Sequence, residues 1–216
     1  MRLIGVYGAS GCGRGVMPLV RDAIASDAMD CELVFIDDGA GPPVVNGHRL
    51  LDWEGFLAIE AERRQVCLAI ANSAVREKLA ARCAAAGVEL LGVRAANVVI
   101  MDEVQIGEGA ILSPFVTLTS NIRIGRCFHA NLYSYVEHDC VIGDFVTFAP
   151  AVRCNGNVVI EDHAYIGAGA LLRQGQPEEP LIIGRGAVVG MGAVVTKSVP
   201  PGVTVVGNPA RPVLRD

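Results

Sequence analysis

The chain has 216 residues, of which 51% are hydrophobic and 5% aromatic, and its formal net charge is −5 at pH 7. It can bury the core of one large domain or two small ones, whereas its acidic balance argues against nucleic acid or an anionic membrane as the main partner. Seven cysteines without a C-x-x-C pair indicate a reduced, cytoplasmic protein, not a disulfide framework or a zinc site. The longest apolar runs are too short for a signal peptide or a membrane-spanning helix.

Residues 1–96 alternate strand and helix patterns. The expected strands are Leu3–Tyr7, Glu32–Ile36, Val66–Ala71 and Val88–Val93. The expected helices cover residues 14–26, 54–64 and 73–86, the last one capped by Asn72 and ended by Gly87. Strands that alternate with helices predict a small parallel sheet with crossover connections.

A glycine-rich turn, Gly8–Gly13, follows the first strand with the spacing G-x-x-G-x-G. Such a strand-to-helix turn can present backbone N–H groups to a phosphate, although the dinucleotide fingerprint is G-x-G-x-x-G. Asp37 and Asp38 end the second strand, where an acid can bind a ribose or a base. The alternative is an inherited fold that binds no nucleotide, because a glycine-rich loop alone is a weak signal.

From about residue 98 the period changes to six. Apolar residues recur at every sixth position from Ile100 to Leu172, and the frame resumes at Ile183, Val189 and Val195. The residue directly after each of these apolar positions is often glycine. The residue four positions after each apolar position is usually small or β-branched. A hexapeptide repeat of this length predicts a parallel β-helix, in which each hexad forms a short strand and a tight turn and the coils stack to bury the apolar row. A β-sandwich of alternating strands is the weaker alternative.

Residues 173–182 interrupt the repeat. The spacing from Leu172 to Ile183 is eleven rather than twelve, and Gly175, Pro177 and Pro180 make the segment a poor strand. We interpret it as a loop that leaves the coil, either as a lid edge or as a tolerated insertion.

His138 is the candidate base. It lies two residues after the apolar position Val136, where strand alternation would turn it inward unless the corner redirects it. A neutral imidazole suits proton transfer near pH 7, and Asp139 could fix its tautomer, with Glu137 as the rival partner. The other interpretation is a surface histidine at a coil corner. His48, His129 and His163 have no such flanking pair, and the spacing of His, Cys and carboxylates predicts no metal site.

Several stretches together resemble a known family. They are 7-YGASGCG-13, 35-FIDD-38, 69-AIANSAVREK-78, 131-NLYSYVEHDCVIGDF-145, 154-CNGNVVIEDHAYIGAGA-170 and 207-GNPA-210. The chain resembles the hexapeptide-repeat sugar acyltransferases, in the branch that holds sialic acid O-acetyltransferases and bacillosamine-pathway and perosamine N-acetyltransferases. The resemblance implies an α/β Rossmann-like nucleotide-sugar-binding domain over residues 1–96 and an all-β left-handed parallel β-helix of hexapeptide repeats over 97–216, assembled as a homotrimer.

The resemblance also implies site roles. His138 becomes the general base and Asp139 the carboxylate that supports it. The residues implied for the coenzyme groove are Thr147, Gly156, Ala168 and Met191, and those implied for the nucleotide sugar are Ser10, Gly11, Cys12, Asp37, Asp38, Ala71 and Asn131. Two positions depart from relatives: Thr147 stands where bacillosamine-type enzymes have a second histidine, and Ala71 where relatives have glycine.

These residues favour an acetyl-CoA-dependent N-acetyltransferase acting on a nucleotide-linked 4-amino-4,6-dideoxy sugar by direct transfer. The oxyanion would be held by a backbone N–H of the Ile142–Asp144 or Asn155–Asn157 turn. Two alternatives stay open. One is an O-acetyltransferase of sialic acid or a related sugar, which the same base would serve. The other is a non-enzymatic trimeric scaffold or ligand sensor.

Overall fold

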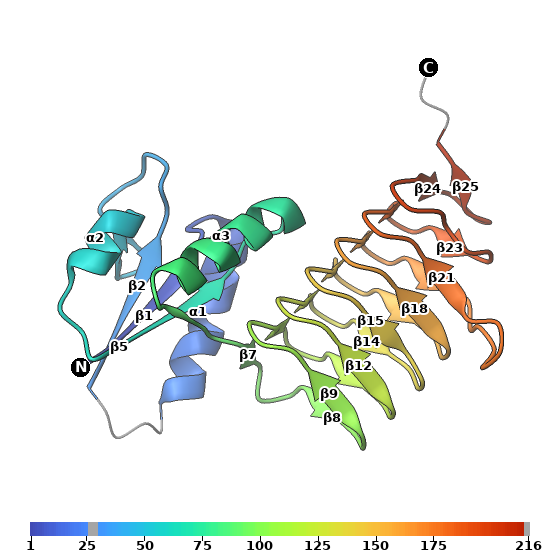
Figure 1. The fold of residues 1–216 in the computed structure, drawn as a ribbon, viewed down its shortest axis with the longest axis horizontal. Helices are drawn as coiled ribbons and strands as arrows, with labels where there is room; N and C mark the ends of the chain where they lie inside the picture. The colour runs from blue at the N-terminus through green and yellow to red at the C-terminus, as the bar shows by residue number, and fades with distance from the viewer. Residues whose placement is uncertain (26–29, 214–216) are drawn as a thin grey trace. The chain divides into compact units, whose positions relative to one another are not determined.

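The computed structural model describes residues 1–25 and 30–213 and divides into two compact units, Met1–Val93 and Arg94–Asp216. Figure 1 shows the fold of each unit. The first is an α/β unit, and the second is a left-handed parallel β-helix.

The first unit is built on a six-stranded sheet in the order β3-β4-β2-β1-β5-β6. Its strands are β1 (Arg2–Tyr7), β2 (Cys31–Ile36), β3 (Val44–Val45), β4 (His48–Leu51), β5 (Arg63–Leu68) and β6 (Glu89–Leu90). Its helices are α1 (Gly11–Ile24), α2 (Trp53–Ala58) and α3 (Ser73–Ala85). The central strand β1 pairs in parallel with both β2 and β5. The chain therefore turns to opposite sides of β1, and the carboxyl ends of β1 and β5 flank a topological switch point, where ligands of such sheets bind.

The expected helix over 54–64 is wrong beyond Ala58. Residues from Arg63 onward pair with β1 as strand β5, so the chain has to leave the helix before that point. The Arg64 guanidinium caps the helix end by donating to the carbonyl oxygens of Leu57 and Ile59. These carbonyls would otherwise lack partners, because the last turn of a helix has no intrahelical donor for them.

Other element bounds also differ from the expected ones. Helix α1 begins at Gly11 rather than at residue 14 and ends at Ile24, and residue 26 lies outside the described residues. The strand expected over 66–71 is displaced to Arg63–Leu68, and that expected over 88–93 is split into β6 and β7 (Val93–Arg94). Asn72 caps α3 as expected, with its side chain accepting from the Val75 N–H.

The hairpin β3–β4 was not expected, although its turn carries a signal. Asn46 and Gly47 have φ angles of 46° and 81°, and an Asn-Gly pair with both φ positive is typical of a tight two-residue hairpin turn. Because both strands are very short, they show too little apolar alternation to stand out from a loop.

The second unit consists of coils stacked in sequence order, with the colour running from green to red in Figure 1. Its strands form three sheets, in the orders β25-β24-β22-β19-β16-β13-β10-β7, β23-β20-β17-β14-β11-β8 and β21-β18-β15-β12-β9. All of them are short: β8 (Val99–Ile100), β9 (Val104–Ile106), β10 (Ile111–Leu112), β11 (Thr117–Leu118), β12 (Ile122–Ile124), β13 (His129–Ala130), β14 (Tyr135–Val136), β15 (Val141–Ile142), β16 (Thr147–Phe148), β17 (Arg153–Cys154), β18 (Val158–Ile160), β19 (Tyr165–Ile166), β20 (Leu171–Leu172), β21 (Leu181–Ile183), β22 (Val188–Val189), β23 (Val194–Val195), β24 (Thr204–Val206) and β25 (Arg211–Pro212).

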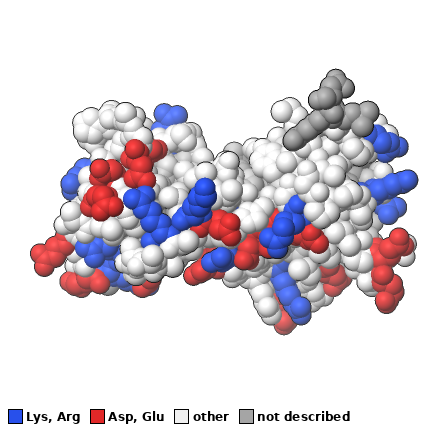
Figure 2. Space-filling view, turned by 45° about the horizontal axis from the view of Figure 1, so that its top comes forward, with Lys and Arg blue, Asp and Glu red and all other residues white. Residues whose placement is uncertain are grey.

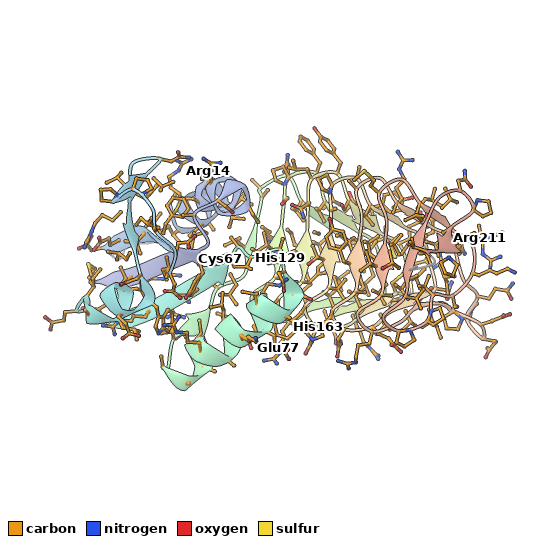
Figure 3. All side chains as sticks on the ribbon, turned by 90° about the horizontal axis from the view of Figure 1, so that it is seen from above. Arg14, Cys67, Glu77, His129, His163 and Arg211 are labelled. Atoms are coloured by element: carbon orange, nitrogen blue, oxygen red, sulfur yellow. The ribbon has the colours of Figure 1, made fainter. Side chains whose placement is uncertain are left out.

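Three hexads make one coil. Val136 lies opposite Cys154, which is the third anchor after it in the hexad frame, and Cys154 lies opposite Leu172 in the same way. The apolar positions of the hexad frame point into the coil: Leu118, Phe148, Ile166 and Ile183, for example, are fully buried. Side chains fill the coil interior (Figure 3), and each large aliphatic one contributes about 1.5–3 kcal/mol by its burial. The expected inward row is confirmed.

The interruption is a small closed loop between β20 and β21. Val141 pairs with Val159 at the regular spacing of one coil, but Val159 pairs with Ile182, so the next coil is longer than three hexads. Gln176 and Glu179 exchange backbone hydrogen bonds of 3.0 and 3.1 Å across the tip of the added segment. The Gly175 N–H donates to the Gly156 carbonyl at the base, 2.9 Å away. These bonds make the segment a fixed projection of the coil.

Residues with positive φ mark the corners of the coils, one for each turn. The His138 corner carries Glu103, Asn121, Asp139 and Asn157 in this conformation. The Asp144 corner carries Gly109, Cys127, Phe145, His163 and Gly186. The third corner carries Phe115, Tyr133, Ala151, Gly169 and Gly192. The left-handed residue turns the chain between two sheets, so the chain changes direction within a few residues.

Candidate active site

His138 and Asp139 form a hydrogen-bonded pair at the His138 corner. The imidazole Nδ1 lies 2.8 Å from Asp139 Oδ2, and the two side chains are 45% and 49% exposed. Strand β14 ends at Val136, and Asp139 has a φ of 58°, so the corner turns His138 outward instead of into the core. With Nδ1–H donating to the carboxylate, the lone pair of Nε2 is left for an outside proton. Asp139, and not Glu137, is the residue bonded to the imidazole.

A second residue holds Asp139. The Asn121 side-chain Nδ2 donates to Asp139 Oδ1 at 3.2 Å, from the coil before. The hydrogen bond from His138 lowers the pKa of the Asp139 carboxyl, and the Asn121 bond lowers it further. The carboxylate is therefore held ionised and fixed at both oxygens. Asn121 was not among the residues expected from sequence. Its position one coil before Asp139 could have indicated that the two side chains are neighbours.

Gly156 lies against the His138 ring. A Cβ built at Gly156 would be 2.5 Å from His138 Cε1 and 2.6 Å from Nε2. Those distances are closer than van der Waals contact, so the imidazole occupies the space that any other residue would need at position 156. The structure thus brings Gly156, expected in the coenzyme groove, to the histidine itself.

One backbone N–H beside the imidazole has no hydrogen-bond acceptor among the described residues. In the two turns expected to supply an oxyanion donor, Gly143 N–H donates to the Ile160 carbonyl and Asp144 N–H to Asp162 Oδ1. The N–H groups of Asn155 and Asn157 are bonded to Leu172 and His138 carbonyls. Within the described residues, the Gly156 N–H alone in the Asn155–Asn157 turn donates to no group.

The glycine-rich turn of the first unit leads directly into α1. Ser10 is the N-cap, with no side-chain hydrogen bond to the helix, and Gly11 is the first helical residue. A Cβ at Gly13 would collide with the Gly8 carbonyl, so the turn folds back tightly on itself. The thiol of Cys12 is partly buried, which raises its pKa. This places Ser10, Gly11 and Cys12 at a helix N-terminus of the kind that binds anions.

Both acids at the end of β2 already accept protein hydrogen bonds. Asp37 accepts from the Ala9 N–H at 3.1 Å and from the Gly39 N–H at 3.0 Å, which ties the glycine-rich turn to β2. Asp38 accepts from the Tyr7 hydroxyl at 2.6 Å, from Arg82 Nη1 at 2.7 Å and from the Trp53 N–H at 3.0 Å. A nucleoside contact from either acid would have to use its remaining lone pairs.

Asp38 and Tyr7 shift each other's pKa values in opposite directions. Burial tends to raise the pKa of Asp38, but the hydrogen bonds from Tyr7, the Trp53 N–H and Arg82 hold it below its ordinary value. Burial first, and the bond to Asp38 second, raise the pKa of Tyr7. Arg82 also lies over the Trp53 ring, 4.9 Å from its centroid. Asp38, Tyr7, Arg82 and Trp53 thus form a bonded, ionised cluster beside the glycine-rich turn.

Ala71 and Asn131 are the other residues expected at the acceptor. Ala71 follows β5 in an exposed loop, and its carbonyl accepts from Arg76 Nη1 at 3.2 Å, as the Ile70 carbonyl does at 2.7 Å. The Asn131 amide donates to the Phe148 carbonyl of the next coil at 2.6 Å. Asn155 makes the equivalent bond to the Leu172 carbonyl. Part of the Asn131 hydrogen-bonding capacity thus serves the coil, and its contact with a sugar stays a prediction.

The three other residues expected in the coenzyme groove differ in exposure. Met191 is 82% exposed and Ala168 is exposed, whereas Thr147 is only 3% exposed. Thr147 lies in β16, beside His129 of β13 and Tyr165 of β19. Met191 and Ala168 are therefore accessible to a ligand on the single chain. The burial of Thr147 weighs against a direct contact, which stays a prediction.

The β-helix carries two other histidines, neither of which is bonded to this pair in the described residues. Figure 3 labels His129 and His163 on the β-helix; His129 is 3% exposed, and His163 stacks on Phe145 with ring centroids 5.3 Å apart. Among residues 1–25 and 30–213, no group of three or more His, Cys, Asp or Glu side chains is arranged to hold a metal ion. In the same residues no helix has the length and apolar character needed to cross a membrane. On the face drawn in Figure 2, basic and acidic side chains are interspersed.

No protein-family model matches the chain. It is 50% identical over 216 residues to a GDP-perosamine N-acetyltransferase of Escherichia coli O157:H7, covering 100% of this chain and 98% of the relative.

Two solved structures resemble it over nearly its full length. WeeI from Acinetobacter baumannii AYE is 59% identical with a TM-score of 0.96, covering 99% of this chain and 100% of that one. The acetyltransferase domain of PglB from Neisseria gonorrhoeae FA1090, in complex with acetyl coenzyme A, is 28% identical with a TM-score of 0.87, covering 98% and 99%. The chain belongs to the hexapeptide-repeat sugar acyltransferases, in the branch of perosamine and bacillosamine N-acetyltransferases.

Proposed function

We propose that the chain transfers the acetyl group of acetyl-CoA to the amino group of a nucleotide-linked 4-amino-4,6-dideoxy sugar, with GDP-perosamine as the first acceptor to test. The observation that carries the proposal is the His138–Asp139 pair, 2.8 Å apart at an exposed corner of the β-helix. The acceptor follows from the relative that is 50% identical over the full length. The product would serve a bacterial surface glycan.

His138 acts as the general base. Its Nε2 takes a proton from the amine as the nitrogen attacks the thioester carbonyl, and the bond from Nδ1 to Asp139 stabilises the imidazolium that forms. A positioned base of this kind supplies about 10² to 10⁴ in rate. The transfer is direct: the carbon–nitrogen bond forms, the carbon–sulfur bond breaks, and the imidazolium returns its proton to the sulfur, so that coenzyme A leaves as the thiol and His138 is again neutral. Cys140, the nearest cysteine in sequence, is fully buried with its sulfur directed to backbone carbonyls, so it is no nucleophile.

The Gly156 N–H is the donor best placed for the oxyanion. It lies beside the imidazole and has no acceptor in the described residues, whereas its neighbours Asn155 and Asn157 donate to carbonyl oxygens. A fixed donor aimed at developing negative charge lowers the barrier because it needs no reorganisation. Ala168 and Met191 would line the path of the coenzyme, and Thr147 would contribute one hydroxyl if a change of conformation exposed it.

The first unit would hold the nucleotide. The first-turn N–H groups of α1, at Ser10, Gly11 and Cys12, suit the diphosphate, and the switch point between β1 and β5 suits the nucleoside. Asp37 and Asp38 follow β2 beside this place, and Ala71, which follows β5, would face the sugar. Asn131 stays a predicted sugar contact of the β-helix. We further propose that the protein works as a homotrimer, since the flat faces of a β-helix carry exposed apolar side chains such as Val99 and Val141. We also propose that it works in the cytoplasm, where its cysteines would stay reduced.

A thiol-release assay tests the proposal. Acetyl-CoA is supplied with GDP-perosamine, with UDP- and dTDP-linked 4-amino sugars, and with free or CMP-linked sialic acid. Thiol release with one amino sugar, and an acetamido product by mass spectrometry, are expected. Release with sialic acid alone would move the chain to O-acetylation. Coenzyme binding without release would point to another acyl group or acceptor, and no coenzyme binding would favour a scaffold.

A further inference from the structure

The His138 corner has a fixed backbone in three successive coils. The N–H groups of Asn121, Asp139 and Asn157 donate to the carbonyls of Asp102, Ser120 and His138, at 3.2, 3.1 and 3.0 Å. Each bond joins a left-handed residue to the coil before it, and the register is the same in all three. Neighbouring side chains of this corner are therefore held about one strand spacing, roughly 4.8 Å, apart.

Asn121 uses this frame to reach Asp139. Its Nδ2 lies 3.2 Å from Asp139 Oδ1, while the other oxygen, Oδ2, accepts from His138. The carboxylate is 49% exposed, and its bonding partners in the described residues are His138 and Asn121. Without the amide, it could rotate about its Cβ–Cγ bond and release the imidazole. Asparagine is also a residue that tolerates the φ of 58° found here.

Gly156 bounds the other side of the pair. The His138 ring lies where a Cβ of residue 156 would be, 2.5 Å from Cε1 and 2.6 Å from Nε2. Gly156 is not among the residues with a positive φ, so a left-handed backbone is not the reason for glycine here. The three atoms that a new Cβ would meet first all belong to the imidazole. Glycine is thus needed at this position for the ring and not for the fold.

We propose that Asn121 and Gly156 are positioning residues of the acetyl transfer: the coil before the catalytic pair holds Asp139 through Asn121, and the coil after it leaves at Gly156 the space that the His138 ring occupies. The inference rests on the proposed role of His138 as base. It extends that role from a two-residue pair to a site built across three coils. Asn121 does not touch the reacting atoms. The positioning role of Gly156 comes from its missing side chain and is separate from the oxyanion contact proposed for its backbone N–H.

The first test replaces Asn121 by glycine. Asn121→Gly removes the donor and suits the left-handed backbone, so the fold is not weakened. Glu103→Gly is the matched control. Glu103 lies at the same corner one coil before Asn121 and has a φ of 56°, and neither His138 nor Asp139 is bonded to it in the described residues. We expect kcat to fall about tenfold in Asn121→Gly with the KM for acetyl-CoA unchanged, and no change in Glu103→Gly.

The second test is a pH profile of kcat/KM for Asn121→Asp. The new carboxylate would face Asp139. Asp139 and Glu137 both act electrostatically on Cys140, so these titratable groups also lie near the pair. The added negative charge favours the imidazolium, so the acid limb of the profile should move to higher pH by about half a unit. An unmoved limb would show that residue 121 does not lie against the His138–Asp139 pair in the working enzyme.

The third test replaces Gly156 by alanine, with Gly15→Ala as control, because a Cβ at Gly15 meets no atom within 4 Å. Gly156→Ala should displace the ring and lower kcat about 10²-fold, with a melting temperature close to that of the wild type. A displacement of about 1 Å is enough for such a loss, since proton transfer requires hydrogen-bond geometry.

His138→Ala separates the two proposals. If it retains full activity, the base assignment itself is wrong. If it is inactive while Asn121→Gly and Gly156→Ala both keep wild-type kcat and Asn121→Asp keeps the wild-type profile, the base stands and the positioning inference is overturned. A fall in kcat in both variants, with melting temperatures preserved, supports it.

Discussion

The His138 corner and the Asp144 corner of the β-helix have the same backbone and different chemistry. At the Asp144 corner, Asp144 Oδ1 accepts from the Arg126 N–H and Asp162 Oδ1 from the Asp144 N–H, at 2.9 and 2.8 Å. Arg185 also donates to Asp162 at 2.6 Å. At the His138 corner the hydrogen bonds run from Asn121 through Asp139 to Nδ1 of His138. Nε2 of the same imidazole has no bonding partner in the described residues. A coil corner therefore becomes reactive when its polar side chains are not all satisfied by one another.

The largest expected contrast lies between the two corner histidines. His138→Ala should lower kcat by about 10² or more, because the base is lost, while acetyl-CoA binding stays near normal. His163, which has a φ of 62° and stacks on Phe145, provides the matched variant His163→Ala. That variant should keep activity within about twofold and lose stability only. Steady-state kinetics and thermal melts measure both; equal activity of the two variants would contradict the contrast.

A second contrast compares two corner glycines. A Cβ at Gly143 would lie 2.7 Å from the Asp162 backbone nitrogen and 3.0 Å from the Glu161 carbonyl carbon, which cannot move aside without the coil. Gly143→Ala should therefore destabilise the fold by about 1–3 kcal/mol, the usual cost of overpacking. Denaturant unfolding measures it, with Gly156→Ala as the partner variant. A Gly143→Ala protein as stable as the wild type would show that the Asp144 corner is not rigid.

A third contrast removes a bond that is internal to the Asp144 corner. Asp162→Ala leaves the Asp144 N–H without its acceptor and should cost about 1 kcal/mol with kcat unchanged. Asp162→Asn keeps an oxygen for that N–H but loses the charge facing Arg185, and it should cost only a few tenths of a kcal/mol. Urea midpoints of the two variants separate the contributions. If the order is reversed, the ion pair dominates this corner.

The smallest expected effect is a pH dependence at the His138 corner. The pKa of Asp139 in the folded chain is lowered from its ordinary value of 3.8 by the His138 and Asn121 bonds. Its contribution to stability is therefore complete above that value and is lost as pH falls through the lowered one. Melting temperatures between about pH 5 and 2 should fall less steeply in Asp139→Asn than in the wild type. Parallel curves would mean that the pair adds no stability.

Much of the fold could be predicted because the β-helix repeats. Each hexad depends on local geometry, so apolar positions such as Leu118 and Ile166 could be identified by counting. The first unit has no such redundancy. The end of α2 at Ala58 depends on the pairing of β5 with β1, and the short hairpin at Asn46–Gly47 has too few residues for a pattern.

The candidate site divides in the same way. His138 and Asp139 are adjacent in sequence, so their pairing could be proposed from the residues. The backbone N–H that would hold the oxyanion could be assigned only to one of two turns. Asn121 could not be identified by that reasoning, because its contact with Asp139 joins two different coils. The hydrogen bonds that Asp37 and Asp38 accept from protein donors could also not be predicted from the residues of the second strand alone.

The sequence by itself determined the period of the second unit, the inward row of apolar residues and the adjacent histidine and aspartate, since each follows from spacing along one chain. The tertiary structure alone decided which coil neighbours support that pair, which N–H is left without an acceptor and why position 156 has no side chain. These depend on distances of a few ångströms between residues a full coil apart in the chain, and those distances exist only once the coils have stacked.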